Sequence, residues 1–507
     1  MHRTLASVDR EKPLACPKET GMKRGYSGFS RKVSRALALS AMLAVMCPAQ
    51  AGAEDMLDPD SFGPMLSREA AKPVAPTRFE KGKEAKKPAA PGRSFTMGRA
   101  VRHALDFNPS LGASEAGAKA SEEGRKAALG ELFPELSTSY SYGYQRQDRD
   151  PASNYSSQPA DRGTFTWNIQ VSQMLFDGFR TLGTYQRQAL QAESDKAALR
   201  QSELQTTGSV QESFIGTLTA MENVRSQREA VARLEDQLAI TTGFYEVGLR
   251  PRLDVLQAQV DLGTAQRELV TLENTRDTTL ATLNTLLGYA ATENVAYEGA
   301  LATRPFERSL EECLEAAYRM RPDLYVGYKA VEMAVKDRLM ARAGYYPQVE
   351  AYYNISSSGN TLGLQRAGSN GSRSTTWEVG ATLSWEVFQW GTTYFSDQQA
   401  GWLVAQARSQ ARGLMLDAGL DVKQNYLALR EAAKRIDVAR QNVAHAREAY
   451  ESALARYREQ VGTNFDVLDA SSNLLTAEVE LTSARGDYLI SLSRLYVSMG
   501  EYMPDLL

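Results

Sequence analysis

Two acidic residues near the C-terminus have the clearest potential chemistry in this sequence of 507 residues. Asp466 and Asp469 stand three positions apart, so on a helix they lie on one face. Several copies arranged symmetrically around an opening would turn each aspartate into a ring of carboxylates, and such rings bind or select cations. The alternative is structural: Asp466 begins a helix, favoured by capping and by the helix dipole, and Asp469 is a first-turn acid.

Patterns typical of catalysis are missing. The three histidines, His2, His103 and His445, are far apart, and no Cys/His cluster has the spacing of a zinc site. We find no nucleophile elbow and no phosphate-binding glycine loop. A net charge of −3 gives no reason to expect nucleic acid as a partner. We therefore predict that the protein is not an enzyme and has no catalytic residue, metal site or cofactor.

The two aspartates belong to a segment that has a counterpart earlier in the chain. Tyr457 precedes Asp466-Val-Leu by nine residues, and Tyr245 precedes Asp254-Val-Leu by nine residues, 212 positions earlier. Each segment separates two long runs that favour helix. We predict two helical hairpins whose turns, here called the tips, lie at 246–254 and 458–466.

The correspondence extends over most of the chain. Leu132-Phe-Pro matches Tyr345-Tyr-Pro at an offset of 213. A nearly constant offset over this length indicates an internal duplication. We predict a first repeat at 95–290, a connecting segment at 291–308 and a second repeat at 309–507. Each repeat has a helix ended by proline, two strands, a very long helix, the tip and a shorter return helix.

Long coiled helices are the strongest pattern. The run 178–245 would be ~100 Å long as a helix, and a helix of this length needs lateral packing. Apolar residues step by three and four from Ile436 to Tyr457, and the same phase recurs 212 positions earlier, from Val224 to Tyr245. This heptad pattern predicts two coiled hairpins.

Four segments alternate between apolar and polar residues, as strands do: 136–145, 164–172, 348–356 and 376–386. Strands of roughly nine or ten residues with aromatic ends are typical of outer-membrane barrels, and an ordinary half-buried sheet is the alternative. After the N-terminal region no apolar run could form a transmembrane helix, so a membrane crossing would need strands. Four strands cannot close a barrel, so membrane insertion would require several chains.

The N-terminus has the pattern of a secretory signal at 1–53. A charged region that includes Arg31 and Arg35 precedes an apolar core at 36–46 and two candidate cleavage sites. A Pro/Lys-rich leader at 54–94 is predicted to be disordered. Removal of the signal leaves Cys313 as the only cysteine, so no disulfide can form within the chain.

The duplication, the Leu175-Phe-Asp-Gly joint and the two tips together resemble the TolC-like outer-membrane efflux protein family. The resemblance covers 95–502 and is closest over four segments: Val461-Gly-Thr, Asp466-Val-Leu-Asp-Ala, Ala484-Arg and Tyr488-Leu-Ile. It implies a mainly α chain with a β membrane part. In a homotrimer, four strands per chain would form a 12-stranded β-barrel in outer-membrane lipid, continued by a long periplasmic α-helical coiled-coil barrel.

The resemblance also implies a function. The protein would be a passive exit duct in the outer membrane of a Gram-negative bacterium, extending into the periplasm and closed at its periplasmic tip. It would dock to a periplasmic adaptor (membrane fusion) protein and to an inner-membrane RND or ABC pump, which supplies the energy.

Several tip residues match functional positions of the family. Asp466 and Asp469 match the acids of the pore constriction. Tyr457 and Asp254 match positions that are linked across the tip in the closed state. We expect opening to be an iris-like rearrangement of the two hairpins, limited by the contact between Asp254 and Tyr457.

Two turns match the segments that adaptors grip: Val247, Gly248, Leu249 and Val461, Gly462, Thr463. One position departs from the family pattern. Gly462 stands where the family's best-known member carries a tip arginine, opposite Leu253. We therefore expect that Leu253 and Gly462 cannot make the equivalent polar lock.

Two questions of function stay open. Within a duct, drug or small-molecule efflux and type I protein secretion both fit, and neighbouring genes would distinguish them. A different class is a non-channel coiled-coil structural or scaffold protein of the cell envelope, which would pack its strands in water and would not fractionate with outer membranes.

Overall fold

The computed structural model describes residues 94–147, 160–364 and 374–503, all within one compact unit of the chain. The signal predicted at 1–53 and the leader predicted at 54–94, except Ser94, lie outside the described residues. None of the helices in the described part of the chain is long and apolar enough to span a membrane.

Each repeat contributes helices and two strands. The elements of the first are α2 (Met97–Phe107), α3 (Pro109–Gly130), β1 (Glu135–Gln147), β2 (Ala160–Phe176), α4 (Arg180–Glu246) and α5 (Arg252–Leu286). Those of the second are α6 (Leu310–Met320), α7 (Pro322–Arg342), the 3₁₀ helix η3 (Ala343–Tyr345), β3 (Gln348–Gly359), β4 (Ser374–Ser384), α8 (Thr392–Arg458) and α9 (Asn464–Met499).

The single helix predicted at the start of each repeat is in fact two helices. The breaks fall at Asn108-Pro109 and at Arg321-Pro322. Proline forces the residue before it into an extended conformation, and Asn108 accordingly has ψ 122°. Its side chain then caps the new helix by accepting a hydrogen bond from the Ser110 N–H at 2.9 Å.

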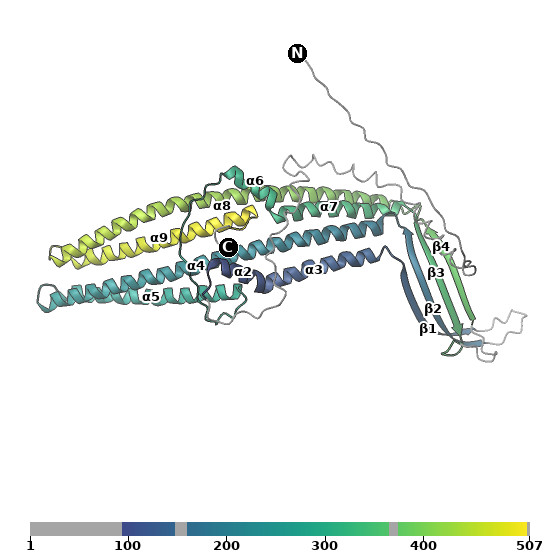
Figure 1. Cartoon of the computed structure of the whole chain (residues 1–507), viewed down its shortest axis with the longest axis horizontal. Helices are drawn as coiled ribbons and strands as arrows, with labels where there is room; N and C mark the ends of the chain where they lie inside the picture. The colour runs from purple at the N-terminus through teal and green to yellow at the C-terminus, as the bar shows by residue number, and fades with distance from the viewer. Residues whose placement is uncertain (1–93, 148–159, 365–373, 504–507) are drawn as a thin grey trace, which may run out of the picture. The chain divides into compact units, whose positions relative to one another are not determined.

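The four strands form one antiparallel sheet in the order β1-β2-β3-β4. The pairing of β2 with β3 joins the two repeats, while β1 and β4 are the edges of the sheet in this single chain. Figure 1 shows the sheet at one end of this unit and the hairpin tips at the other.

Most strand boundaries differ from the prediction by one to four residues, and two of the ends have a local structural reason. β2 does not end at Ser172 but continues to Phe176, with an irregularity in its pairing at Met174 that the simple alternation could not reveal. β4 ends at Ser384, not at residue 386. Ser384 pairs with Gln348, the first residue of β3, and the preceding Pro347 has no N–H to extend the ladder.

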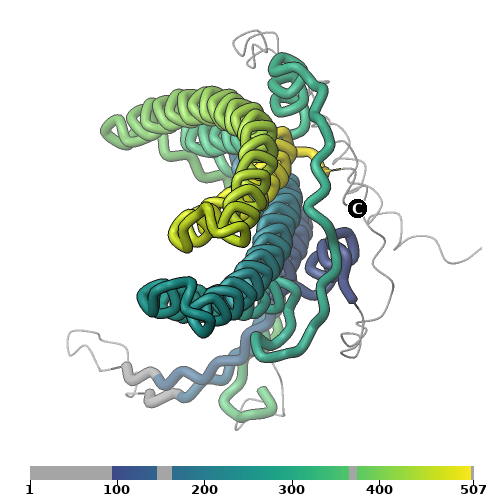
Figure 2. Tube along the Cα trace, turned by 90° about the vertical axis from the view of Figure 1, so that its left-hand side faces the viewer, coloured from purple at the N-terminus to yellow at the C-terminus, as the bar shows by residue number. Residues whose placement is uncertain are grey.

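The long helices α4 and α8, of 67 residues each, pair with the return helices α5 and α9 to form two hairpins. The hairpins contact each other mainly through α4 and α9, which lie side by side (Figure 2). The heptad pattern does mark buried positions such as Val224 and Ile436. It fails at one equivalent pair, because Tyr457 is fully buried whereas Tyr245 is 43% exposed.

The hydrophobic core lies away from both the sheet and the tips. It gathers α2 and α6, the middle of α4 and α8, and the ends of α5 and α9 around residues such as Phe214, Leu287 and Leu495. The core anchors both hairpins at one level, and contacts between the hairpins join them nearer the tips.

Candidate functional site

The two tips follow similar backbone paths but differ at the most constrained position. In the first, Gly248 has φ +78°; in the second, the equivalent residue is Gln460, with φ +63°. A left-handed φ suits glycine, because a Cβ is crowded in this conformation. The second tip therefore contains a strained residue where the first does not.

Asp466 does not begin α9 but is its third residue, and it forms a capping box with the N-cap residue Thr463. The Thr463 hydroxyl accepts a hydrogen bond from the Asp466 N–H at 3.1 Å, and the Asp466 carboxylate accepts one from the Thr463 N–H at 3.0 Å. This N–H, together with the Thr463 side chain, holds the pKa of the Asp466 carboxyl below its ordinary value. Asp469 accepts from Asn473 Nδ2 at 3.1 Å. The structural role of Asp466 is thus present, and both carboxylates remain exposed on the single chain.

The structure does not join the two residues that the resemblance links across the tip. The Tyr457 hydroxyl donates to Thr241 Oγ1 at 3.2 Å rather than to the Asp254 carboxylate. Asp254 instead takes part through its backbone carbonyl, which accepts from Asn464 Nδ2 at 3.1 Å. The hairpins are linked at this level, but by different atoms from those expected.

Asn464 is the centre of that link. It is 2% exposed, and its Oδ1 accepts from Gln237 Nε2 at 2.8 Å and from Thr241 Oγ1 at 3.3 Å. Gln237 and Thr241 lie on α4, whereas Asp254 lies on α5. Because a buried amide is costly unless it is hydrogen-bonded, this network fixes the start of α9 against the first hairpin.

Arg250 makes a further contact between the turns themselves. Its Nη2 donates to the Gly462 carbonyl at 2.6 Å, and its guanidinium carbon lies 4.9 Å from the centroid of the Tyr457 ring. Gly462 is buried, whereas the Leu253 side chain is 66% exposed. Leu253 and Gly462 do lack polar side chains, as expected. Arg250 of the first hairpin nevertheless makes a polar contact with the Gly462 carbonyl of the second.

A second tie lies farther from the tips. Glu478 on α9 accepts from Arg233 of α4 and from Arg447 of α8, each at 3.4 Å. The Arg233 guanidinium also lies 6.0 Å from the centroid of the Tyr450 ring. Three helices from both hairpins therefore meet at one carboxylate.

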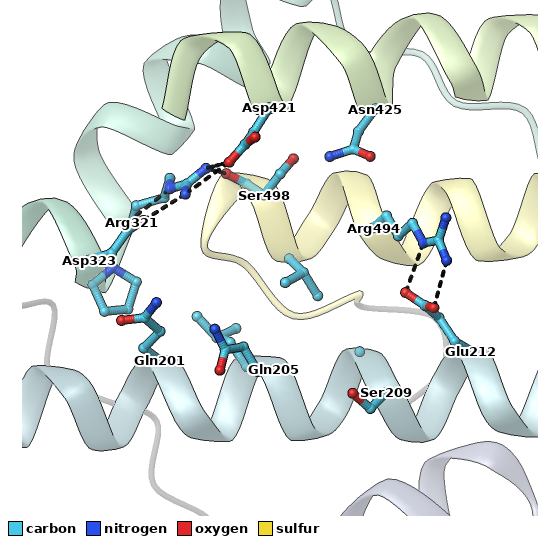
Figure 3. A pocket seen from close by; sticks show the side chains of 14 residues that line it. Gln201, Gln205, Ser209, Glu212, Arg321, Asp323, Asp421, Asn425, Arg494 and Ser498 are labelled. Atoms are coloured by element: carbon cyan, nitrogen blue, oxygen red, sulfur yellow. Dashed lines mark hydrogen bonds and ion pairs between the residues drawn. The ribbon is translucent and has the colours of Figure 1, made fainter. Parts of the chain in front are cut away.

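A polar cavity of about 420 Å³ lies between α4, α7, α8 and α9. Figure 3 shows Arg321 directed at Asp421, and Arg494 paired with Glu212. Arg321 also donates to Asp323 at 2.6 Å. Carboxylates therefore neutralise both arginines of the lining. Neither arginine is left available to bind an anion in this cavity.

The residues predicted to contact an adaptor differ in exposure. Val247, Leu249 and Val461 are 69%, 52% and 70% exposed. Gly248 and Thr463 are also exposed, whereas Gly462 is buried in the tip. Each tip thus presents apolar side chains to its surroundings, and Gly462 is not part of that surface.

The sequence pointed to the tips but missed four residues that join them: Gln237, Thr241, Arg250 and Asn464. Two signals were available. Arg250 is the equivalent of Gly462 under the offset of 212, so the missing arginine has a counterpart in the other repeat. Thr241 is a polar residue at a heptad position that is normally apolar.

The comparisons with known proteins agree with one another. The model of the outer membrane efflux protein family matches residues 100–289 and 313–501, one match in each repeat. The outer membrane protein TolC of Vibrio cholerae is 24% identical over 406 residues, covering 78% of this chain and 89% of that protein. The alkaline protease secretion protein AprF of Pseudomonas aeruginosa is 24% identical over 402 residues, covering 77% and 82%.

Solved structures show the same fold. The CmeC outer membrane channel of Campylobacter jejuni matches with a TM-score of 0.72 at 17% identity, covering 83% of this chain and 90% of that one. With two matched repeats, the four-stranded sheet and two long hairpins in hand, the chain belongs to the outer membrane efflux protein family.

Proposed function

We propose that this protein acts as a homotrimer, docked to a periplasmic adaptor and an inner-membrane pump, and that its hairpin tips are the gate. Membership of the family makes it an outer-membrane efflux duct that extends into the periplasm of a Gram-negative bacterium, not a scaffold of the cell envelope. One structural observation supports the trimer and the gate: the same chain has a sheet with two unpaired edges and two helices of 67 residues that lead to linked tips.

The sheet supports the trimer. Its edge strands β1 and β4 leave unpaired backbone groups, which lipid does not tolerate. Side chains on these strands, including Leu136, Trp377 and Val379, are 66% to 71% exposed. Pairing β4 of one copy with β1 of the next removes the edges, and three copies give the 12 strands expected for the family.

The partners follow from the relatives and the tip surface. One relative is named for alkaline protease secretion and another for toluene efflux, so protein secretion and small-molecule efflux both suit this duct. We propose an RND or ABC pump as its inner-membrane partner. Val247, Leu249 and Val461 form an exposed apolar surface at the tips on which an adaptor can dock. Gly248 and Thr463 complete this surface.

The exposed carboxylates of Asp466 and Asp469 supply the chemistry of the gate. Around a threefold axis each residue forms a ring of three carboxylates, which attracts cations while it is ionised. Protonation removes this charge, so we expect the cation current to fall as the pH is lowered.

Single-channel conductance of the purified, detergent-extracted protein in a planar bilayer tests the proposal. We expect small cation-selective steps that acid reduces, and loss of both selectivity and pH dependence in the double variant D466N/D469N. D437N removes an exposed carboxylate of α8 away from the tips and serves as the control. A protein that stays soluble without detergent and forms no channels would contradict the duct. Native mass spectrometry that shows any state other than a trimer would contradict the assembly.

A further inference from the structure

Arg250 lies where the two turns meet. Its donor nitrogen is 2.6 Å from the Gly462 carbonyl oxygen, and its guanidinium faces the ring of the fully buried Tyr457. We infer that Arg250 is a clamp within each chain that holds the second hairpin tip against the first and sets how readily the duct opens. This inference rests on the proposed function, because it assigns the regulation of the same gate.

The internal duplication explains the geometry of the clamp. Arg250 and Gly462 are equivalent residues of the two repeats, and the contact therefore joins one turn to its own counterpart. A Cβ at position 462 would lie 3.1 Å from the Tyr457 N and 3.2 Å from Arg456 Cβ, so a larger residue would crowd the turn whose carbonyl Arg250 contacts. The arginine of one turn supplies the donor, and the glycine of the other turn supplies the acceptor.

The clamp and the Asn464 network differ in accessibility. Asn464 is buried among hydrogen-bond partners, so removing its side chain would disturb the packing of the hairpins. Arg250 is only partly buried and reaches across from a turn. A guanidinium hydrogen bond requires close contact, and so does stacking on an aromatic ring. A small separation of the tips therefore breaks both of its contacts together, which makes Arg250 the residue whose contacts open first.

The test compares the open probability of single channels formed by the wild type, R250A, R250K and R252A. Losing a hydrogen bond from a charged donor corresponds to roughly a tenfold change in an equilibrium. We therefore expect R250A to be open about tenfold more often. R250K should lie between R250A and the wild type, because lysine keeps the charge but not the planar stack. Arg252 is exposed two positions away, so R252A removes the same charge without touching the clamp.

A second measurement reports the clamp without relying on current. Spin labels at the exposed positions of V247C and V461C give the separation of the tips by pulsed electron paramagnetic resonance. We expect longer and broader distances in R250A than in the wild type and R252A. An unchanged open probability together with unchanged distances in R250A would overturn the inference while the duct itself stands. Channels absent from the wild type and all variants would instead contradict the proposed function.

Discussion

The Asp466 carboxylate serves two purposes at once. It accepts the Thr463 N–H at 3.0 Å and so satisfies a donor at the start of α9. It is also exposed beside Asp469, where the proposed ring of charge requires it. The two roles support each other, because the hydrogen bond that caps the helix favours the ionised form of the carboxyl.

Removing the cap should therefore change the pH dependence of the duct. The pKa of Asp466 is lowered first by the Thr463 N–H and then by the Thr463 side chain, so the carboxylate stays ionised to a lower pH than usual. In T463A the N–H contribution remains and the side-chain contribution is lost. The pKa should rise part of the way to its ordinary value, and acid should reduce cation selectivity at a higher pH than in the wild type.

Reversal potentials measured across a salt gradient at a series of pH values check this shift. T463S keeps the hydroxyl and should match the wild type. A midpoint that moves to lower pH in T463A, or moves equally in T463S, would contradict the role of the cap.

At the scale of elements, the two tips show how one turn tolerates different sequences. Two residues after the end of each long helix, the chain has a residue in the left-handed conformation: Gly248 in the first tip and Gln460 in the second. A side chain in this conformation costs about 1 kcal/mol or more, and glycine avoids that cost. The second tip holds its strained turn in place with the Arg250 and Asn464 contacts.

Exchanging the residues should therefore have opposite effects on the two tips. Q460G relieves the strain and should slow amide hydrogen exchange in the second tip by about fivefold, which corresponds to about 1 kcal/mol of local stability. G248Q introduces the strain and should speed exchange in the first tip by a similar factor. Hydrogen exchange followed by mass spectrometry measures both, with peptides from the middle of α4 as the internal reference. Faster exchange in Q460G would show that flexibility of the glycine outweighs the relief of strain.

Sequence periodicity carries much of the information on these elements. The heptad steps between Ile436 and Tyr457 locate one side of the hairpin contact because burial repeats with the helix. The same reasoning could not separate Tyr457, which is buried, from Tyr245, which is 43% exposed, because duplication gives both the same local pattern. Their surroundings differ only once the hairpins pack together.

The candidate site shows the same limit. Asp466 and its cap could be predicted, since a capping box is local in sequence. The link from Arg250 to Gly462 spans 212 positions and uses a backbone carbonyl, which no pattern of side chains reveals. The partner of the Tyr457 hydroxyl likewise depends on how the hairpins pack, and the folded chain places Thr241 Oγ1 there at 3.2 Å instead of the expected Asp254.

At the scale of the whole molecule, the single chain leaves large apolar side chains uncovered along α8. Trp402, Leu416, Leu420 and Leu427 are 51% or more exposed, and they recur at helical spacing on the side opposite the buried Val422. A stripe of this kind is typical of an interface between helices. The proposed trimer provides the cover, since each copy has the same stripe and a neighbour to receive it.

Replacing one residue of this stripe by a charge should prevent assembly. In L420E a carboxylate would be buried between copies without a partner, at a cost of several kcal/mol for each interface. The interface repeats three times in a closed ring, so the costs add and the trimer should give way to monomers. A428E places the same charge on an exposed position of α8 that lies off the stripe, and it should leave the trimer intact. Native mass spectrometry in detergent distinguishes these outcomes. A trimer that survives L420E would mean that α8 faces water in the assembly, and that the copies associate through their strands alone.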